Sequence, residues 1–170
     1  MQDNVRSFKL RDDGDIPNNQ TYPVLVYHGI FHNNPNEIEG TFNRHGWQGS
    51  WSGDVHDYHH YHSNTHEVLG VRSGNGVIQV GGDAGERLTL NEGDVIVLPA
   101  GTGHMKIESS EDFEVVGAYP DGATYNMRRK DPGLRAQSLA EIRDVPMPAT
   151  DPVYGNEGPL LRKWQNQDQR

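Results

Sequence analysis

Residues 67–119 read EVLGVRSGNGVIQVGGDAGERLTLNEGDVIVLPAGTGHMKIESSEDFEVVGAY, and they form the most regular part of the sequence. β-type runs alternate here with turns rich in Gly, Asn, Asp or Ser. The runs are Glu67–Arg72, Val77–Val80, Glu86–Leu90, Asp94–Leu98, His104–Ile107 and Phe113–Tyr119. Short strands with turns about every 8–12 residues are typical of an antiparallel sandwich or barrel. We therefore predict a mainly β fold.

The segments on either side of this region follow other patterns. Tyr22–Phe31 is predicted as a further strand. A short helix is predicted to begin with Pro35 at its first position, and another is predicted over Leu134–Arg143. From Asp144 onward the chain carries four prolines, at 146, 148, 152 and 159, which indicate an extended tail.

Length and composition limit the possible classes of protein. The 170 residues and 19.0 kDa suggest one domain, or one domain with long arms. The 20 glycines and 10 prolines disfavour long helices. Because only 33% of the residues are apolar, the hydrophobic core is expected to be small, and dimerisation could supplement it. The absence of cysteine excludes disulfides, thiol catalysis and Cys-based zinc sites.

Charge and hydropathy exclude further classes of partner. The formal net charge of −9 repels phosphate backbones and anionic membranes, so we expect neither nucleic acid nor membrane partners. No stretch approaches the roughly 18 consecutive apolar residues of a membrane helix. The polar N-terminus lacks the apolar core of a signal peptide, which favours a cytoplasmic protein.

A cluster of histidines precedes the first of these strands. Five of the nine histidines fall within eleven residues: His56, His59, His60, His62 and His66. Because residues two apart in a strand share a face, His60 and His62 point the same way and His59 points the opposite way. After a turn at residues 63–65, Glu67 opens the next strand, so two imidazoles and a carboxylate can converge. A solvated His-rich loop, an adventitious metal binder or a hydrogen-bonded strand histidine are the alternatives.

A second segment, Gly93–His104, reads GDVIVLPAGTGH. Its strand ends at a Pro-Ala-Gly-Thr-Gly turn, in which the glycines supply positive φ angles. His104 begins the strand that leaves this turn, so in a barrel its side chain could meet the first cluster.

Together the two segments resemble the motifs of the cupin family of small jelly-roll barrels. That family's first motif runs Gly, five residues, His-x-His, three or four residues, Glu, six residues, Gly, and its second runs Gly, five residues, Pro-x-Gly, two residues, His, three residues, Asn. The matching residues are His60, His62, Glu67, Gly74, Gly93, Pro99, Gly101 and His104. Two positions depart from the motifs: Asp54 stands where the first motif begins with Gly, and Glu108 stands where the second motif ends with Asn. HYHSNTHEVLGV, VVGAYPDG and DPVYG…GPLLRKW also resemble the uncharacterised YjlB-like cupins over nearly the whole chain.

The resemblance implies a fold and a division of the chain. We expect a single cupin domain over residues 1–170, built as an antiparallel jelly-roll β-barrel. Its motif core would span about 53–119, with an N-terminal arm over 1–47, a C-terminal arm over 121–170 and one or two short helices in these arms. Dimerisation through edge strands is common in cupins, so the resemblance also implies a possible homodimer.

The same resemblance maps His60, His62, Glu67 and His104 onto the family's four metal ligands. Three imidazoles and a carboxylate suit one divalent transition metal, namely Fe, Mn, Ni, Co, Cu or Zn. Because imidazole ligands must be neutral, occupancy is expected to fall below about pH 6.5. His66 is a rival ligand, since it adjoins Glu67 and points to the opposite face of a regular strand; the family pattern favours Glu67.

Other polar and aromatic residues are assigned roles outside the ligand set. His56, Tyr58 and His59 are expected around the site or at the surface, Trp47 and Trp51 against the barrel or over a pocket, Glu108 in solvent, and His28, His32 and His45 in structural positions.

The function implied by the resemblance is a metal-dependent small-molecule enzyme of dioxygenase or isomerase type. A non-catalytic module that binds a small ligand or metal, and a barrel with a purely structural ion, are the alternatives. Neither a DNA-binding helix-turn-helix nor a Ser–His–Asp arrangement is evident.

Overall fold

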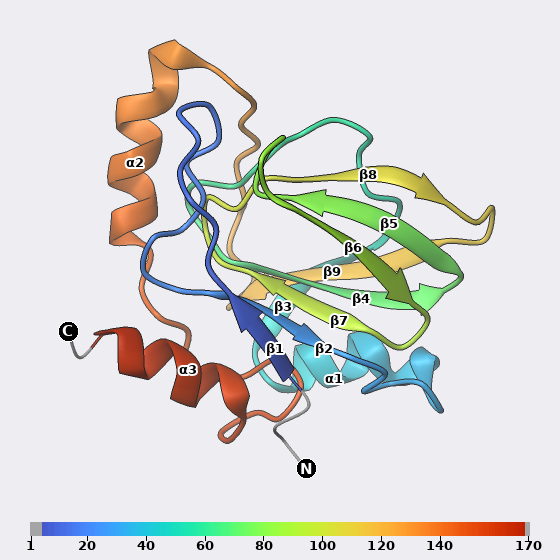
Figure 1. The fold of residues 1–170 in the computed structure, drawn as a ribbon. Helices are drawn as coiled ribbons and strands as arrows, with labels where there is room; N and C mark the ends of the chain where they lie inside the picture. The colour runs from blue at the N-terminus through green and yellow to red at the C-terminus, as the bar shows by residue number, and fades with distance from the viewer. Residues whose placement is uncertain (1–4, 169–170) are drawn as a thin grey trace.

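The fold consists of two antiparallel sheets that face one another, with two of the helices against one outer face and a third beside the ends of the strands (Figure 1). The computed structural model describes residues 5–168, so the ends of both predicted arms, residues 1–4 and 169–170, lie outside the described residues. The larger sheet has the order β1 (Val5–Phe8), β2 (Val24–Tyr27), β7 (Val95–Leu98), β4 (Glu67–Ser73), β9 (Glu114–Pro120), β3 (Trp47–Gly53). The smaller has the order β6 (Glu86–Asn91), β5 (Asn75–Val80), β8 (His104–Ser109). The predicted mainly β jelly roll is confirmed, although the two sheets do not close into one ladder.

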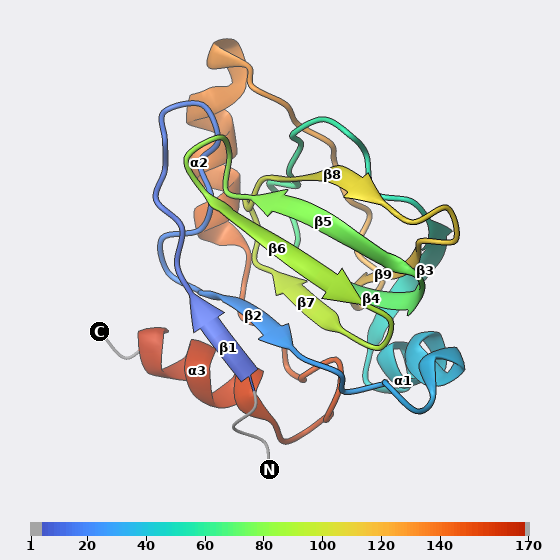
Figure 2. The ribbon, with the colours of Figure 1, turned by 45° about the vertical axis from the view of Figure 1, so that its right-hand side comes forward.

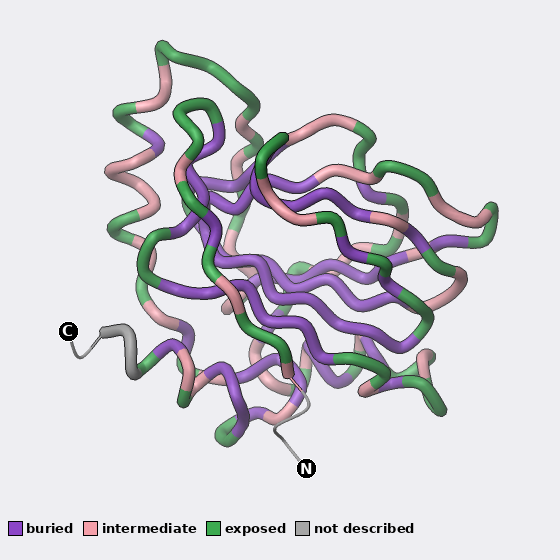
Figure 3. The backbone as a smooth tube through the Cα atoms, in the orientation of Figure 1, coloured by how far each residue is buried: buried purple, intermediate pink, exposed green. Residues whose placement is uncertain are grey.

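Alternation along the central strands divides the apolar residues between two cores. In β7, Val95 and Val97 belong to the core between the larger sheet and the helices, whereas Ile96 and Leu98 face the space between the two sheets. The larger sheet is therefore buried on both faces, which explains why β2 and β7 read as continuous apolar runs (Figure 3). In β4, Leu69 faces the space between the sheets, and Glu67 lies two residues before it.

Three α-helices are present among the described residues. They are α1 (Ile38–Arg44), α2 (Arg135–Asp144) and α3 (Pro159–Asp168), with short 3-10 helices at Pro35–Glu37 and Pro132–Leu134 preceding α1 and α2. α1 packs on β3, β4 and β9, and α3 runs beneath β1 and β2 (Figure 2). No helix within residues 5–168 has both the length and the apolar character needed to cross a membrane.

Both predicted helices form, but other expectations need correction. The strand predicted over Tyr22–Phe31 is present only at Val24–Tyr27, since the chain turns directly afterward. The tail after Asp144 is not extended throughout: α3 begins with Pro159 at its first position, where proline's missing N–H costs nothing. Two strands, β1 and β3, are not predicted from the sequence, and β3 (WQGSWSG) contains two glycines, which have low β-propensity.

Gly70 allows α1 to approach the larger sheet. A Cβ at this position would lie 2.6 Å from Ile38 Cγ2 and 3.0 Å from Phe42 Cζ, both in buried side chains of α1. We therefore expect Gly70→Ala to lower the free energy of unfolding by about 2 kcal/mol, as overpacking of a core does. Thermal unfolding would measure this as a decrease of about 4–8 °C in Tm.

Gly40 provides a control of opposite sign on the helix itself. A Cβ there meets only Arg44 Nη1 at 4.0 Å, and Ala is a better helix former than Gly by up to about 1 kcal/mol. Gly40→Ala is thus expected to leave Tm unchanged or raise it. An equal response of Tm to both substitutions would contradict the close approach at Gly70.

Candidate metal centre

Backbone hydrogen bonds bring the two histidine-bearing segments together. His60 and His104 form an isolated antiparallel bridge, with N–O distances of 3.2 Å and 3.0 Å, and their ring centroids lie 4.1 Å apart. The carbonyl of His62 accepts a hydrogen bond from Gly101 N at 2.8 Å. Gly101 has the positive φ, +91°, that the sequence predicted for this turn. The turn thus fixes the position from which His104 enters the site.

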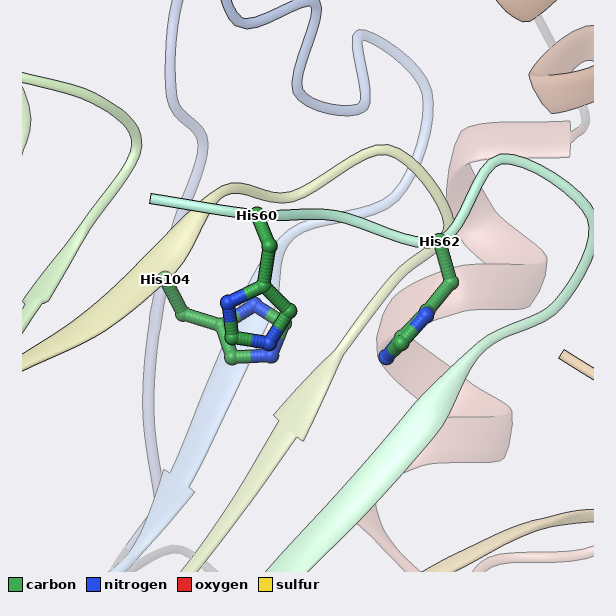
Figure 4. A group of neighbouring side chains, drawn as sticks. All are labelled: His60, His62 and His104. Atoms are coloured by element: carbon green, nitrogen blue, oxygen red, sulfur yellow. The ribbon is translucent and has the colours of Figure 1, made fainter. Parts of the chain in front are cut away.

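The three histidines direct their rings toward one space (Figure 4). One ring nitrogen from each of His60, His62 and His104 lies within 4.8 Å of the other two, and all three residues are buried. Tyr61, between the first two, points elsewhere and donates its hydroxyl to Ser138 Oγ at 3.0 Å. The predicted alternation of side-chain direction along residues 60–62 is therefore present, although this segment is not a continuous strand. The trio could hold a metal ion.

Glu67 reaches the same space from β4. Its Oε1 atom lies 3.3 Å from His62 Nε2 and 3.2 Å from His104 Nε2. Its other oxygen, Oε2, accepts a hydrogen bond from the Tyr119 hydroxyl at 2.7 Å. Oε1 itself is buried and receives no well-directed hydrogen bond. A buried carboxylate oxygen without a donor is costly, so this atom calls for a cation or a proton in front of it.

The backbone fixes which nitrogen of each imidazole is available. The Nδ1 atoms of His60, His62 and His104 face the carbonyl oxygens of Tyr58, Asn126 and Thr102, respectively. A carbonyl only accepts, so we assign the proton of each neutral ring to Nδ1. Each Nε2 then carries a free lone pair, and such carbonyl contacts commonly orient histidine ligands in metal sites. Three lone pairs and Oε1 make a donor set that a divalent cation would satisfy.

Burial and the neighbouring groups shift the pKa values of His60, His62 and Glu67. Burial and the neighbouring His104 lower the pKa of His60 to about 2, which keeps that ring neutral. Burial raises the pKa of Glu67, but the charges of the neighbouring His62 and His104 outweigh this effect and hold the pKa below its usual range. Burial lowers the pKa of His62, and the Glu67 carboxylate reverses this, with a net increase. Glu67 is therefore anionic.

His66 is engaged elsewhere. Its Nε2 donates to the carbonyl of Pro146 at 2.9 Å, and its Nδ1 accepts from Ala100 N at 2.9 Å. The ring also packs edge-on against Tyr22 and Trp164. With both nitrogens used by the backbone, His66 has none left for a metal, and its role is structural.

A cavity of about 210 Å³ opens beside the histidines and Glu67. Its other walls come from Trp51, Gly53, Asp54, Val55, His56, Leu69, Tyr119, Tyr125 and Met127. The sequence had suggested that Trp47 or Trp51 could cover a pocket. Trp51 does line it, whereas Trp47 is buried and donates to the carbonyl of Thr150. Tyr119, Tyr125 and Met127 were missed, because no local pattern near β9 marks them.

The remaining candidates lie outside the ligand cluster. His56 lines the cavity and stacks on Tyr58, while His59 is absent from the cavity wall, in agreement with its opposite parity. His28, His32 and Glu108 are exposed. His45 bonds through Nδ1 to the carbonyl of Pro152 at 3.0 Å.

Comparisons with known proteins agree with this architecture. A family model described as "Cupin domain" matches residues 46–117. The chain is 43% identical over 164 residues to "Uncharacterized protein YjlB" of Bacillus subtilis (strain 168), covering 96% of this chain and 99% of that protein.

Solved structures show more distant similarity. Acireductone dioxygenase from Bacillus anthracis, with a cadmium ion in its active centre, is 18% identical, with a TM-score of 0.37 over 69% of this chain and 79% of that chain. WlaRA, a TDP-fucose-3,4-ketoisomerase from Campylobacter jejuni, is 15% identical, with a TM-score of 0.37 over 47% of this chain and 62% of that chain.

Proposed function

Because this chain belongs to the cupin family, we propose that it is a metal-dependent enzyme that acts on a small molecule. His60, His62, Glu67 and His104 would hold one divalent transition metal, chosen from Fe, Mn, Ni, Co, Cu and Zn. The observation that carries this proposal is the donor set: three imidazoles with Nδ1 bound to carbonyls, and one buried carboxylate oxygen without a donor. The cavity beside these residues would admit the substrate.

In this proposal the four ligand residues would bind the metal, and other groups of the chain orient these ligands. When bound, such a metal would supply Lewis-acid or redox chemistry of the dioxygenase or isomerase type. Three backbone carbonyls fix the histidine rings. Tyr119 fixes the carboxylate of Glu67 and is itself held by Trp51 Nε1, which donates to its hydroxyl at 2.8 Å. Trp51 and Leu69 contribute apolar surface to the wall of the cavity beside these groups.

Elemental analysis of tag-free protein tests the proposal directly. We expect about one equivalent of metal after reconstitution at neutral pH, removable by a chelator. Oxygen consumption or substrate conversion that stops on chelation and returns with metal would support an enzyme. Ligand binding without turnover would instead indicate a binding module. Protein that takes up no metal would contradict the site.

Tyr119→Phe is expected to weaken metal affinity without abolishing it. The substitution removes the hydroxyl that donates to Glu67 Oε2, so the carboxylate loses the contact that orients Oε1 toward the histidines. Losses of this kind cost about 10–100-fold in metal affinity. Competitive titration with a chromophoric chelator would measure the change in Kd.

Tyr125→Phe is the matched control. Tyr125 stacks on Tyr119 with ring centroids 4.6 Å apart, but its hydroxyl does not contact Glu67. We expect its metal Kd to stay within about twofold of the parent. Both substitutions keep the stacked rings, so an equal loss of affinity in the two variants would contradict a specific role for the hydrogen bond from Tyr119 to Glu67.

A further inference from the structure

The side chains along the walls of the cavity are mainly apolar or aromatic, whereas its floor is formed by the polar side chains of the three histidines and Glu67. Six apolar or aromatic side chains line the cavity: Trp51, Val55, Leu69, Tyr119, Tyr125 and Met127. None of the lining residues is Lys or Arg. Both acidic residues there are already engaged, because Asp54 Oδ2 pairs with Lys106 Nζ at 2.5 Å and Glu67 faces the histidines. The wall therefore offers contact with an apolar ligand and no fixed cation for an anionic one.

The polar atoms of Trp51 and Tyr119 are also engaged in hydrogen bonds. Trp51 Nε1 donates to the Tyr119 hydroxyl, which in turn donates to Glu67. These two residues consequently present ring surface rather than hydrogen-bond donors to the cavity. Tyr125 stacks on Tyr119 at an interplanar angle of 22° and lies edge-on to His62, with centroids 5.0 Å apart. A flat ligand beside His62 would meet an aromatic surface that is already aligned.

Two large apolar side chains at this cavity remain unusually accessible. Tyr125 is 41% exposed and Met127 is 42% exposed, and both line the cavity. Exposed apolar surface that rims a concave site is typical of a binding surface. Methionine adapts its shape readily and makes favourable contacts with aromatic rings. A ring in the cavity would cover the apolar surface of both residues.

The size of the cavity limits the ligand further. An apolar cavity of about 150 Å³ can hold benzene, whereas sites for drug-sized ligands span about 300–1,000 Å³. The cavity here, at about 210 Å³, suits one ring with a small substituent.

We propose that this cavity binds a single-ring aromatic compound with one anionic group, its ring against Trp51, Tyr119, Tyr125 and Met127 and its anionic group toward the histidines. The inference rests on the proposed function, since the bound metal is the cation that would attract the anionic group toward the histidines. An aliphatic dicarboxylate fits less well, because its second carboxylate would lie against the apolar wall without a cation.

Calorimetric titration of the zinc-loaded protein tests this inference with three probes. Benzoate carries the ring and one carboxylate, acetate lacks the ring, and succinate replaces the ring with a second carboxylate. Burial of the ring should make benzoate bind at least about tenfold more tightly than either aliphatic probe. Benzoate that binds no more tightly than acetate or succinate to protein with one equivalent of zinc would overturn the inference and leave the metal site intact. Protein that retains no zinc would overturn the proposed function, and the inference with it.

Substitutions in the wall give an independent test. Tyr125→Ala should weaken benzoate binding about tenfold with zinc content unchanged. Met127→Arg adds a cation to the wall and should shift the ratio of benzoate to succinate affinity toward succinate at least about tenfold. Ile107→Arg is the matched control, because Ile107 is 37% exposed but does not line the cavity. An equal shift in both arginine variants would contradict the proposed position of the ligand.

Discussion

His62→Ala is expected to abolish stoichiometric metal binding. The substitution removes one of three buried ring nitrogens that lie within 4.8 Å of one another, and it also removes a neighbour of Glu67 Oε1. Losing a group that merely supports a ligand costs about 10–100-fold in affinity, so losing a ligand should weaken Kd by at least about 100-fold. Elemental analysis of the tag-free variant, next to the parent reconstituted under identical conditions, would measure the loss.

His59→Ala is the control from the same histidine cluster. His59 lies outside the cavity, and its Nε2 is 3.8 Å from Asp83 Oδ1. This variant should keep most of the metal, whereas His104→Ala, from the second segment, should lose it as His62→Ala does. Thermal unfolding of each metal-free variant would establish that it is folded. Equal metal retention by the His59 and His62 variants would refute the ligand assignment.

Local rules in the sequence predict correctly how the three histidines of the cluster are arranged. Alternation places His60 and His62 on one side, and a glycine turn places His104 at the start of β8. What alternation could not supply was the choice between His66 and Glu67, because either could face inward if the chain bulged. The deciding contacts to His66 come from Ala100 and Pro146, which lie 34 and 80 residues away in the chain.

The cavity wall was not predictable for a similar reason. Tyr119 is the penultimate residue of β9, which reads as ordinary β sequence, and Tyr125 and Met127 follow this strand in an irregular segment. Only tertiary packing brings Tyr119 and Tyr125 against His62 and Met127 into the cavity wall. The position of the Trp51 ring likewise depends on Gly117 in β9, because a Cβ at residue 117 would lie 2.4 Å from that ring. The sequence of β9 does not reveal this contact.

The C-terminal tail shows where composition misled the prediction. Its prolines suggested an extended segment, yet Pro159 begins α3 and the helix buries Leu160 and Trp164, four residues apart. That spacing places both side chains on one helix face. Trp164 stacks on Tyr22 with centroids 4.7 Å apart, so a segment more than 130 residues away in the chain stabilises the helix.

Asp151→Ala should produce the largest loss of stability among the substitutions considered. Asp151 is fully buried, and its carboxylate accepts four hydrogen bonds, from Tyr27 Oη and from the backbone N–H groups of Val153, Tyr154 and Leu160. It thereby links β2 to the start of α3. Truncation leaves these donors buried without an acceptor, at about 1–3 kcal/mol each, not additively. We expect a loss of about 4 kcal/mol, measured as a decrease of about 8–16 °C in the Tm of metal-free protein.

Two further variants separate the role of the Asp151 carboxylate from a general effect of removing an acidic side chain. Asp83→Ala removes a fully exposed carboxylate and should change stability by less than about 0.5 kcal/mol. Asp151→Asn keeps one acceptor oxygen but places an amide N–H₂ opposite two of the four donors, so its loss should lie between those of the two alanine variants. If Asp151→Ala and Asp83→Ala had the same Tm, α3 would be held to β2 by apolar packing alone. The junction would then depend on the stacking of Trp164 against Tyr22 rather than on the buried carboxylate.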